Sequence, residues 1–340
     1  MARQSSLLVV GAGFAGSTAA RLLAEQGHKV RVIDQRSHVA GNAYDYVNDQ
    51  HIRIHQYGPH IFHTSDARVW RFLSRFTDWV PYYHRVRCMT DWGDLVDFPP
   101  TADMIEHWGQ PKILDVLYGP YTRKMWGHDI DQIDPGVLDR VRRRDPHQTG
   151  YFNDQWQCLP RHGYTQLISR MLDHDNITVQ LNTAWHMDMR SEYNTVWLSM
   201  SIDQFHDYSL GRLPYRSLRF HDWQVHGDPL SDVPVVNFTT QPRYTRCTDW
   251  RLFPNQPTDQ PLPVGTVTLE EPCDAADNNG ERYYPVPDPA GHNRDLYRRY
   301  VQITPQGVIF IGRCGLYSYL DMHQAVSSTQ HRVMQWLRDQ

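Results

Sequence analysis

Lysine, cysteine and long apolar segments are scarce in this chain of 340 residues, and each scarcity excludes a class of protein. The five cysteines are widely spaced and form no CxxC pair, so the sequence predicts neither a disulfide framework nor a metal site. The N-terminal apolar run, Leu7 to Val10, falls far short of the roughly 20 residues that span a bilayer. We therefore expect a cytoplasmic protein without a membrane span.

An excess of positive charge is also absent. The formal net charge is −4, 21% of the residues are charged, and the isoelectric point is about 6.5. Nucleic-acid domains usually carry a strongly basic face, so this balance argues against a nucleic-acid partner. Only Lys29, Lys112 and Lys124 are lysine, and the other basic residues are arginine. Arginine can bind phosphate through two parallel hydrogen bonds, although a GC-rich coding bias explains the composition equally well.

The N-terminal segment has the pattern of a βαβ unit. Leu7 to Val10 is typical of a buried parallel strand, Ser17 to Gln26 of a helix ended by Gly27, and Lys29 to Asp34 of a second strand. Between the first strand and the helix lies Gly-Ala-Gly-Phe-Ala-Gly, residues 11–16, and Asp34 follows 18 residues after Gly16. This spacing predicts a dinucleotide site, with pyrophosphate at the helix N-terminus and ribose on the carboxylate. The alternative is that the glycines serve only a turn.

A second glycine-bearing turn bears on the choice of dinucleotide. Asp34-Gln35-Arg36 leads to Gly41-Asn42-Ala43-Tyr44, which resembles a turn of FAD-binding mutases and amine oxidases. We therefore favour FAD over NAD.

The rest of the chain predicts further domains in an α/β fold. An amphipathic helix is expected from Asp66 to Trp79, a hairpin at 80–100, helices between Thr101 and Met125, and a helix from Tyr164 to Asp173. The polar segment from Trp126 to Gly150 has the composition of a mobile lid loop. Strands at 233–238, 245–249 and 264–269 predict a separate mixed sheet, and a strand at 308–312 with a helix at 322–338 is expected to return to the N-terminal sheet.

These elements predict a Rossmann-type FAD-binding domain, an inserted small helical domain and a mixed β-sheet domain that binds substrate. The expected bounds are residues 1–78, about 185–220 and 305–340 for the FAD-binding domain, about 100–150 for the helical domain, and about 79–99, 151–184 and 221–304 for the substrate domain.

Blocks in a fixed order over nearly the whole chain resemble the UDP-galactopyranose mutase family. They are Val32–Arg36, Gly41–Tyr44, Tyr57–Thr64, Gly119–Gly127, Tyr151-Phe152, Gly163–Thr165, Ile202–Phe205, Tyr215–Leu218, Val236–Thr239, Tyr244–Arg246, Tyr283–Val286, Gly312-Arg313 and Asp321–Gln324. The resemblance implies an isomerase that interconverts the pyranose and furanose forms of a nucleotide-diphosphate hexose. It also implies a covalent adduct between N5 of reduced FAD and the sugar, with no net redox change.

The resemblance assigns functions to individual residues. Arg140, on the lid loop, and Arg246 match the catalytic arginines that bind the diphosphate, although Arg142, Arg143 and Arg144 lie close to the first. The implied substrate-binding residues are Tyr121 and Trp126, which stack on the base and line the sugar pocket, the phosphate-contacting Tyr151, Tyr284 and Tyr319, and in addition Arg85, Arg216 and Asn237. Solvated surface charge is the alternative for the arginines, and core packing for the aromatic residues.

The expected cofactor contacts come from both ends of the chain. They are Gly11, Gly13, Phe14, Ala15, Gly16, Asp34, Gln35, Arg36, Gly41, Asn42, His60, Ile61, Arg313, Tyr319, Asp321 and Met322. An arginine beside the flavin, here Arg313, favours the anionic reduced form, whereas a strand-end salt bridge is its alternative. His60 and His63 fall in the loop that the family places against the flavin, and we assign proton transfer to neither.

Several positions depart from the family pattern. The helical segment between Pro99 and Gly119 is short, and Arg85, Ser209 and Leu320 replace the usual residues. Because of these departures, the sequence does not determine the base, the hexose or whether the protein forms a homodimer. A GDP- or dTDP-sugar is the alternative substrate. Two other classes also stay open: an amine-oxidase-like flavin oxidoreductase, and an inactive relative that only binds nucleotide sugars.

Overall fold

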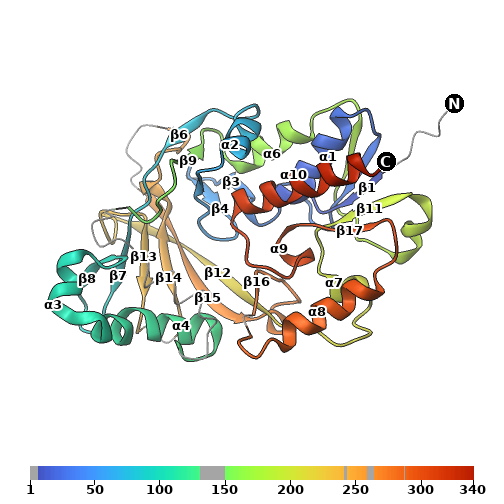
Figure 1. Cartoon of the computed structure of the whole chain (residues 1–340). Helices are drawn as coiled ribbons and strands as arrows, with labels where there is room; N and C mark the ends of the chain where they lie inside the picture. Colours follow the sequence, from blue (N-terminus) through green and yellow to red (C-terminus); the bar gives the residue numbers. More distant parts are fainter. Residues whose placement is uncertain (1–6, 131–149, 241–242, 259–263, 287) are drawn as a thin grey trace.

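The computed structural model describes residues 7–130, 150–240, 243–258, 264–286 and 288–340 (Figure 1). Its largest elements are a parallel sheet flanked by helices and a long mixed sheet that ends near a small group of helices. Among the described residues, no helix is long and apolar enough to cross a bilayer.

The parallel sheet has the strand order β10-β2-β1-β11-β17. The strands are β1 (Leu7–Val10), β2 (Val30–Ile33), β10 (Ile177–Gln180), β11 (Thr195–Leu198) and β17 (Val308–Phe310). Every residue of β1 is buried because the sheet is covered on both faces: Leu7 and Val9 join one core cluster, and Leu8 and Val10 join another. The predicted return of the C-terminal strand to the N-terminal sheet is confirmed.

Helices cover both faces of this sheet (Figure 1). On one face α1 (Phe14–Glu25) packs against α6 (Tyr164–Leu172) and α10 (Met322–Arg338), with α2 (Ala67–Leu73) beside α10. On the other face lie α7 (Ile202–Phe205) and α8 (His292–Ile303). Short helical turns occur at η1 (Gly41–Ala43), η4 (Met187–Glu192), η5 (Trp250–Leu252), η6 (Ala275–Asp277) and α9 (Gly312–Gly315).

The mixed sheet has the order β16-β12-β15-β14-β13-β7-β8. Its strands are β7 (Val86–Met89), β8 (Leu95–Phe98), β12 (Tyr215–His226), β13 (Val235–Phe238), β14 (Arg246–Asp249), β15 (Val264–Asp274) and β16 (Tyr284–Pro285). The predicted hairpin at 80–100 and the three predicted strands of a separate mixed sheet are confirmed. Two smaller sheets pair β3 (Asp45–Val47) with β4 (Arg53–His55), and β9 (Trp156–Pro160) with β5 (Phe62–Thr64) and β6 (Trp79–Pro81).

The predicted helical segment beside this sheet is present. It contains α3 (Ala102–Ile113), a π-helical turn η2 (Leu114–Tyr118) and α4 (Gly119–Trp126). The Thr101 hydroxyl caps α3, and Gly127, at a φ of 73°, ends α4 in the left-handed conformation that favours glycine. Ile113 and Leu117 pack against Cys88 of β7, so the helices lie on the end of the mixed sheet.

Three expectations about element boundaries are corrected. Residues 177–180, expected with the substrate domain, form β10 and pair with β2; this strand lies at the sheet edge and is mostly exposed, so it lacks an apolar run. Residues 215–220, expected in the FAD-binding domain, begin β12 of the mixed sheet. The helix expected to reach Trp79 ends at Leu73. Trp79 instead starts β6, where its ring stacks on Phe62 with centroids 4.9 Å apart.

Candidate functional site

The glycine turn between β1 and α1 has no room for a side chain at Gly11 or Gly16. A Cβ on Gly16 would lie 1.8 Å from the Gly11 carbonyl oxygen, and one on Gly11 would lie 1.9 Å from Ser199 Oγ. Gly13 is the N-cap of α1 and no side chain caps that helix, so its first backbone N–H groups face the turn. Such an open helix N-terminus is suited to a phosphate group.

The second glycine turn packs directly on the first. A Cβ on Gly41 would lie 3.1 Å from Gly13 Cα, and the Ala40 N–H donates to the Ala12 carbonyl at 2.9 Å. Asp34 lies between the turns, where its carboxylate accepts from the backbone N–H groups of Ala12 at 2.8 Å and Arg36 at 2.9 Å. The two turns therefore form one cradle.

This cradle opens into a cavity of about 480 Å³. Thirteen of the residues predicted to contact the cofactor line it: Gly11, Gly13, Phe14, Ala15, Gly16, Asp34, Gln35, Arg36, Gly41, Asn42, His60, Arg313 and Met322. Ile61, Tyr319 and Asp321 do not line it: Ile61 is buried in the core, Tyr319 packs on Tyr284, and Asp321 caps α10. The assignment of these residues to a cofactor stays a prediction.

Sequence reasoning missed the residues at the other side of the cavity. Arg282 donates to Gln204 Oε1 at 2.8 Å and to the Tyr208 hydroxyl at 3.1 Å, and Arg212 lies 3.6 Å from the centre of the Tyr208 ring. Glu281 forms an ion pair with Arg36 at 2.7 Å. A weak signal was present, because Gln204 and Arg282 belong to or adjoin blocks that resemble the family.

A second group of side chains is built by strand register in the mixed sheet. Asn237 of β13, Arg246 of β14 and Glu270 of β15 are opposite one another on adjacent strands, so their side chains share one face. Arg246 donates to Asn237 Oδ1 at 3.2 Å and to both carboxylate oxygens of Glu270 at 3.4 Å. It also donates to the Tyr121 hydroxyl of α4 at 3.3 Å. The predicted site residues Asn237 and Tyr121 therefore meet around Arg246, together with Glu270, which the sequence did not single out.

Burial and the neighbouring charges shift the pKa values of these residues in opposite directions. Burial disfavours the charge of Arg246, but Glu270 and Tyr121 outweigh that effect and hold the pKa of the guanidinium above its usual range. Burial raises the pKa of the Glu270 carboxyl, against the opposing effect of Arg246. Burial also raises the pKa of Tyr121 to about 12, so its hydroxyl stays protonated. The row holds a partly buried cation with a neutral hydroxyl beside it.

Arg313 connects the cavity to the predicted tyrosines. It lines the cavity, and its guanidinium lies 5.1 Å from the ring centre of Tyr284 and 5.0 Å from that of Tyr319. The two tyrosine rings are stacked with centroids 5.6 Å apart, and Trp126 meets Tyr284 edge-on at 6.0 Å. Arg313 is held by the carbonyls of Leu320 at 2.6 Å and Tyr283 at 3.2 Å, and among the described residues it forms no strand-end salt bridge, which is the alternative interpretation of this arginine.

Two predicted substrate residues lie elsewhere. Arg85 is exposed and forms an ion pair with Asp232 at 3.3 Å, whereas its neighbour His84 is buried, with its ring 5.3 Å from Tyr151. Arg216 donates to the Met125 carbonyl at 2.7 Å and the Lys124 carbonyl at 3.2 Å, so it supports the end of α4. Arg140 and its neighbours Arg142, Arg143 and Arg144 lie outside the described residues.

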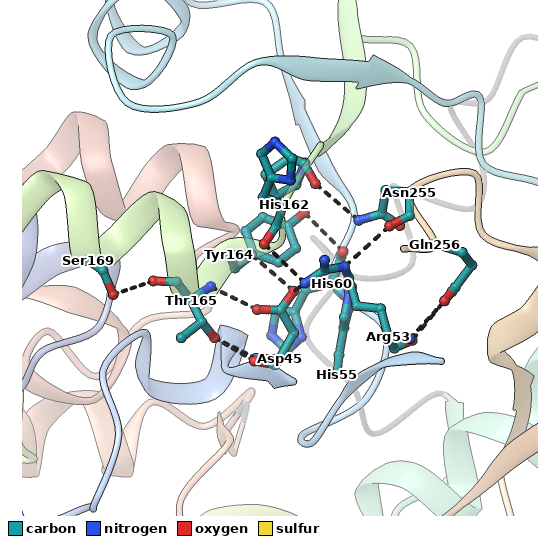
Figure 2. Close-up of polar contacts among 11 residues, drawn as sticks. Asp45, Arg53, His55, His60, His162, Tyr164, Thr165, Ser169, Asn255 and Gln256 are labelled. Atoms are coloured by element: carbon teal, nitrogen blue, oxygen red, sulfur yellow. Dashed lines mark hydrogen bonds and ion pairs between the residues drawn. The ribbon is translucent and has the colours of Figure 1, made fainter. Parts of the chain in front are cut away.

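A polar network holds the loop that carries His60 (Figure 2). The His60 N–H donates to His55 Nδ1 at 3.0 Å, and the Tyr164 hydroxyl donates to the His60 carbonyl at 3.0 Å. Nδ1 of His60 lies 2.8 Å from the Gly58 carbonyl, which can only accept, so this nitrogen carries the proton. Burial lowers the pKa of His60 to about 3, with smaller effects from His55, Arg313 and Arg246, so the ring is neutral.

The fold and site define a Rossmann-type nucleotide-binding enzyme with a second, arginine-centred site on a mixed sheet. The chain belongs to the UDP-galactopyranose mutase family, whose model matches residues 116–319, and the model of an NAD(P)-binding Rossmann-like domain matches residues 9–76. The predicted fold class and the predicted family, whose members are isomerases, are both confirmed.

Relatives agree with this placement. A probable UDP-galactopyranose mutase of Klebsiella pneumoniae is 30% identical and covers 95% of this chain and 92% of the relative. A dTDP-fucopyranose mutase of Escherichia coli is also 30% identical, covering 94% of each chain. The crystal structure of a reduced UDP-galactopyranose mutase matches the fold with a TM-score of 0.75 and 14% identity, over 99% of this chain and 96% of that chain.

Proposed function

We propose that this protein interconverts the pyranose and furanose forms of a nucleotide-diphosphate hexose, with UDP-galactose as the substrate and reduced FAD as the cofactor. The observation that carries the proposal is the row of Arg246, Asn237 and Glu270, which lies beside the tyrosines that Arg313 connects to the dinucleotide cavity. Two relatives at 30% identity carry names of pyranose mutases that act on nucleotide sugars.

The cavity fits an FAD. The two glycine turns pack closely together and line the cavity at a helix N-terminus suited to the pyrophosphate, and Asp34 is placed to accept from a ribose hydroxyl. Arg313 and Met322 line the cavity from the C-terminal segment and would contact the flavin end. When bound and reduced, FAD supplies the nucleophile for the anomeric carbon of the sugar without net redox change.

Side chains of the protein would stabilise the negative charge of the nucleoside diphosphate. Arg246 is anchored by Glu270 and Asn237, so its guanidinium is already oriented before a ligand arrives. A departing diphosphate gains negative charge, and a preorganised arginine in a buried site stabilises that charge without rearrangement. The protonated hydroxyls of Tyr121 and Tyr284 add neutral donors, since burial raises the pKa of both tyrosines.

An anaerobic assay with dithionite and a panel of UDP-, dTDP- and GDP-hexoses, read by chromatography, tests the proposal. We expect a furanose product from UDP-galactose only when the flavin is reduced. Equal turnover with oxidised flavin would contradict the proposed mechanism. Turnover of dTDP-sugars alone would show that the substrate is a dTDP-sugar and not UDP-galactose. The dTDP-fucopyranose mutase relative makes a dTDP-hexose the second candidate.

The amine-oxidase alternative has a separate test. Putrescine oxidase shares the fold with a TM-score of 0.58 at 13% identity, which concerns architecture alone. Net oxidation of an amine with stoichiometric hydrogen peroxide would favour that alternative. We expect no net redox change, and nucleotide-sugar binding without turnover would instead indicate an inactive relative.

A further inference from the structure

Three potential metal ligands meet outside the lining of the dinucleotide cavity. They are His63 of β5, Asp321 at the N-cap of α10 and His323 in the first turn of that helix. One donor atom from each lies within 4.8 Å of the other two. None of the three lines the cavity described above, so they form a separate cluster.

His63 is held in the arrangement of a metal-binding histidine. Its Nδ1 lies 2.6 Å from Asp154 Oδ2, and the other oxygen of Asp154 accepts from the Ser65 hydroxyl at 2.9 Å. Its ring stacks on Phe152, with centroids 3.7 Å apart and 12° between the planes. Metal-binding histidines commonly donate their second nitrogen to a carboxylate, which orients the nitrogen that binds the ion.

The other two ligands, Asp321 and His323, each have an atom available to bind a metal ion. Asp321 uses its side chain to accept a backbone N–H in the first turn of α10, which leaves its second oxygen available. Within the part of the chain that the structure describes, no hydrogen bond reaches the His323 ring, which meets His63 edge-on with centroids 4.9 Å apart. Imidazole nitrogens and a carboxylate therefore converge on one point.

We propose that His63, His323 and Asp321 bind a divalent transition-metal ion of the zinc type, with a water molecule in the fourth position. Two imidazoles and one carboxylate are a ligand set for such ions, and three protein ligands leave one position open. A tetrahedral zinc site requires ligand atoms roughly 3.4 Å apart, given bonds of about 2.0 to 2.1 Å. The ligand atoms now lie within 4.8 Å of one another, so binding an ion would require the side chains to rotate towards it. The ion would fix the start of α10 beside Met322, which lines the cofactor cavity.

Zinc retention by tag-free protein tests this proposal. The protein is dialysed against a chelator, given zinc sulfate alone, passed through a desalting column and subjected to elemental analysis. We expect about one zinc per chain, little zinc in His63→Gln or His323→Gln, and binding weakened about 10- to 100-fold in Asp154→Asn. His221→Gln is the matched control, because His221 also pairs with a carboxylate, Glu271 at 2.8 Å, but belongs to no such cluster among the described residues.

Two results overturn the proposal: no zinc retained by the wild-type protein, or full retention by both glutamine variants. Melting temperature and FAD content show whether each variant is folded. If the variants do not fold, the proposal is tested by chemical modification of histidines in the wild-type protein, with and without zinc. Protection of His63 and His323 by zinc supports the site, and modification at an unchanged rate contradicts it.

Discussion

At the scale of single residues, the site depends on how one partly buried arginine is held. Arg246 contacts an amide, a carboxylate and a phenol on three different elements, so it reaches the site with little freedom to reorient. Preorganised charge of this kind contributes more to a transition state than a flexible surface charge does.

Replacing Arg246 with alanine tests that view. A charge-assisted contact to departing phosphate is worth a few kcal/mol, so turnover should fall on the order of 10²–10³-fold, measured with reduced enzyme. Arg246→Lys should recover only part of the loss, because lysine keeps the charge without the planar fork. FAD content should not change, since Arg246 does not line the dinucleotide cavity.

Arg243→Ala is the matched control for Arg246. Arg243 lies three residues earlier, is exposed and pairs with Glu271 at 2.9 Å, so its loss should leave turnover near normal. If both alanine variants slow turnover equally, the loss reflects the removal of a positive charge in general and not the position of Arg246 in the site.

Glu270→Gln probes the partner of Arg246. Removing one member of a buried ion pair leaves the other charge uncompensated, so we expect a loss of about 3 kcal/mol in unfolding free energy. A bound diphosphate should replace the missing carboxylate, so UDP should raise the melting temperature more in the variant than in the wild type. Equal shifts in the two proteins would show that UDP does not contact Arg246.

At the scale of elements, one carboxylate ties the β3–β4 hairpin to α6 (Figure 2). Asp45 accepts from the backbone N–H groups of Tyr164 at 3.1 Å and Thr165 at 2.8 Å, which caps the helix, and it pairs with Arg53 at 3.3 Å. Because the Tyr164 hydroxyl holds the His60 carbonyl, the cap also positions the His60 loop, which lines the cavity beside the two glycine turns.

Asp45→Asn should therefore destabilise the protein and loosen that loop. Loss of the carboxylate removes a helix cap and an ion pair that are buried, so we expect about 2 to 3 kcal/mol less unfolding free energy in urea titrations. Ser169→Ala removes a hydroxyl on the exposed side of α6 that donates to the Thr165 carbonyl, and it should change stability by less than about 0.5 kcal/mol. Similar losses in the two variants would contradict the special importance of the cap.

At the scale of the whole molecule, histidines with lowered pKa values predict sensitivity to acid. Burial is the main cause that lowers the pKa of His55, His60 and His84 to about 3, with the charge of a nearby arginine, Arg53 or Arg246, acting in the same direction. The unfolded chain binds these protons near pH 6.5, so the stabilisation is complete above that pH and is lost as the pH falls towards 3. Each histidine can remove up to about 1.4 kcal/mol per pH unit.

Urea denaturation at pH 7, 6 and 5 measures this slope. We expect unfolding free energy to decrease steeply below pH 6.5 and expect His84→Asn to flatten the decrease by about one third. An unchanged slope in that variant would mean that His84 is not buried in its neutral form.

The sequence alone was sufficient for the family, the fold class and the position of the glycine turn. Those features are local or depend on ordered blocks: Gly16 is required by its close backbone contact with Gly11 within one turn, and Asp34 follows at the end of the next strand. The edge strand β10 and the half-exposed β12 were missed or misplaced because neither has a continuous apolar pattern.

Tertiary structure alone decided which of two neighbouring residues faces the site. Glu270 and Glu271 are adjacent, yet Glu270 faces Arg246 whereas Glu271 faces His221 and Arg243 on the other side. His84 is likewise buried near the site, and the predicted Arg85 points to Asp232. Side chains in an extended chain alternate between two faces, so composition and motif order identify the segment, but only strand register determines which face lies inward.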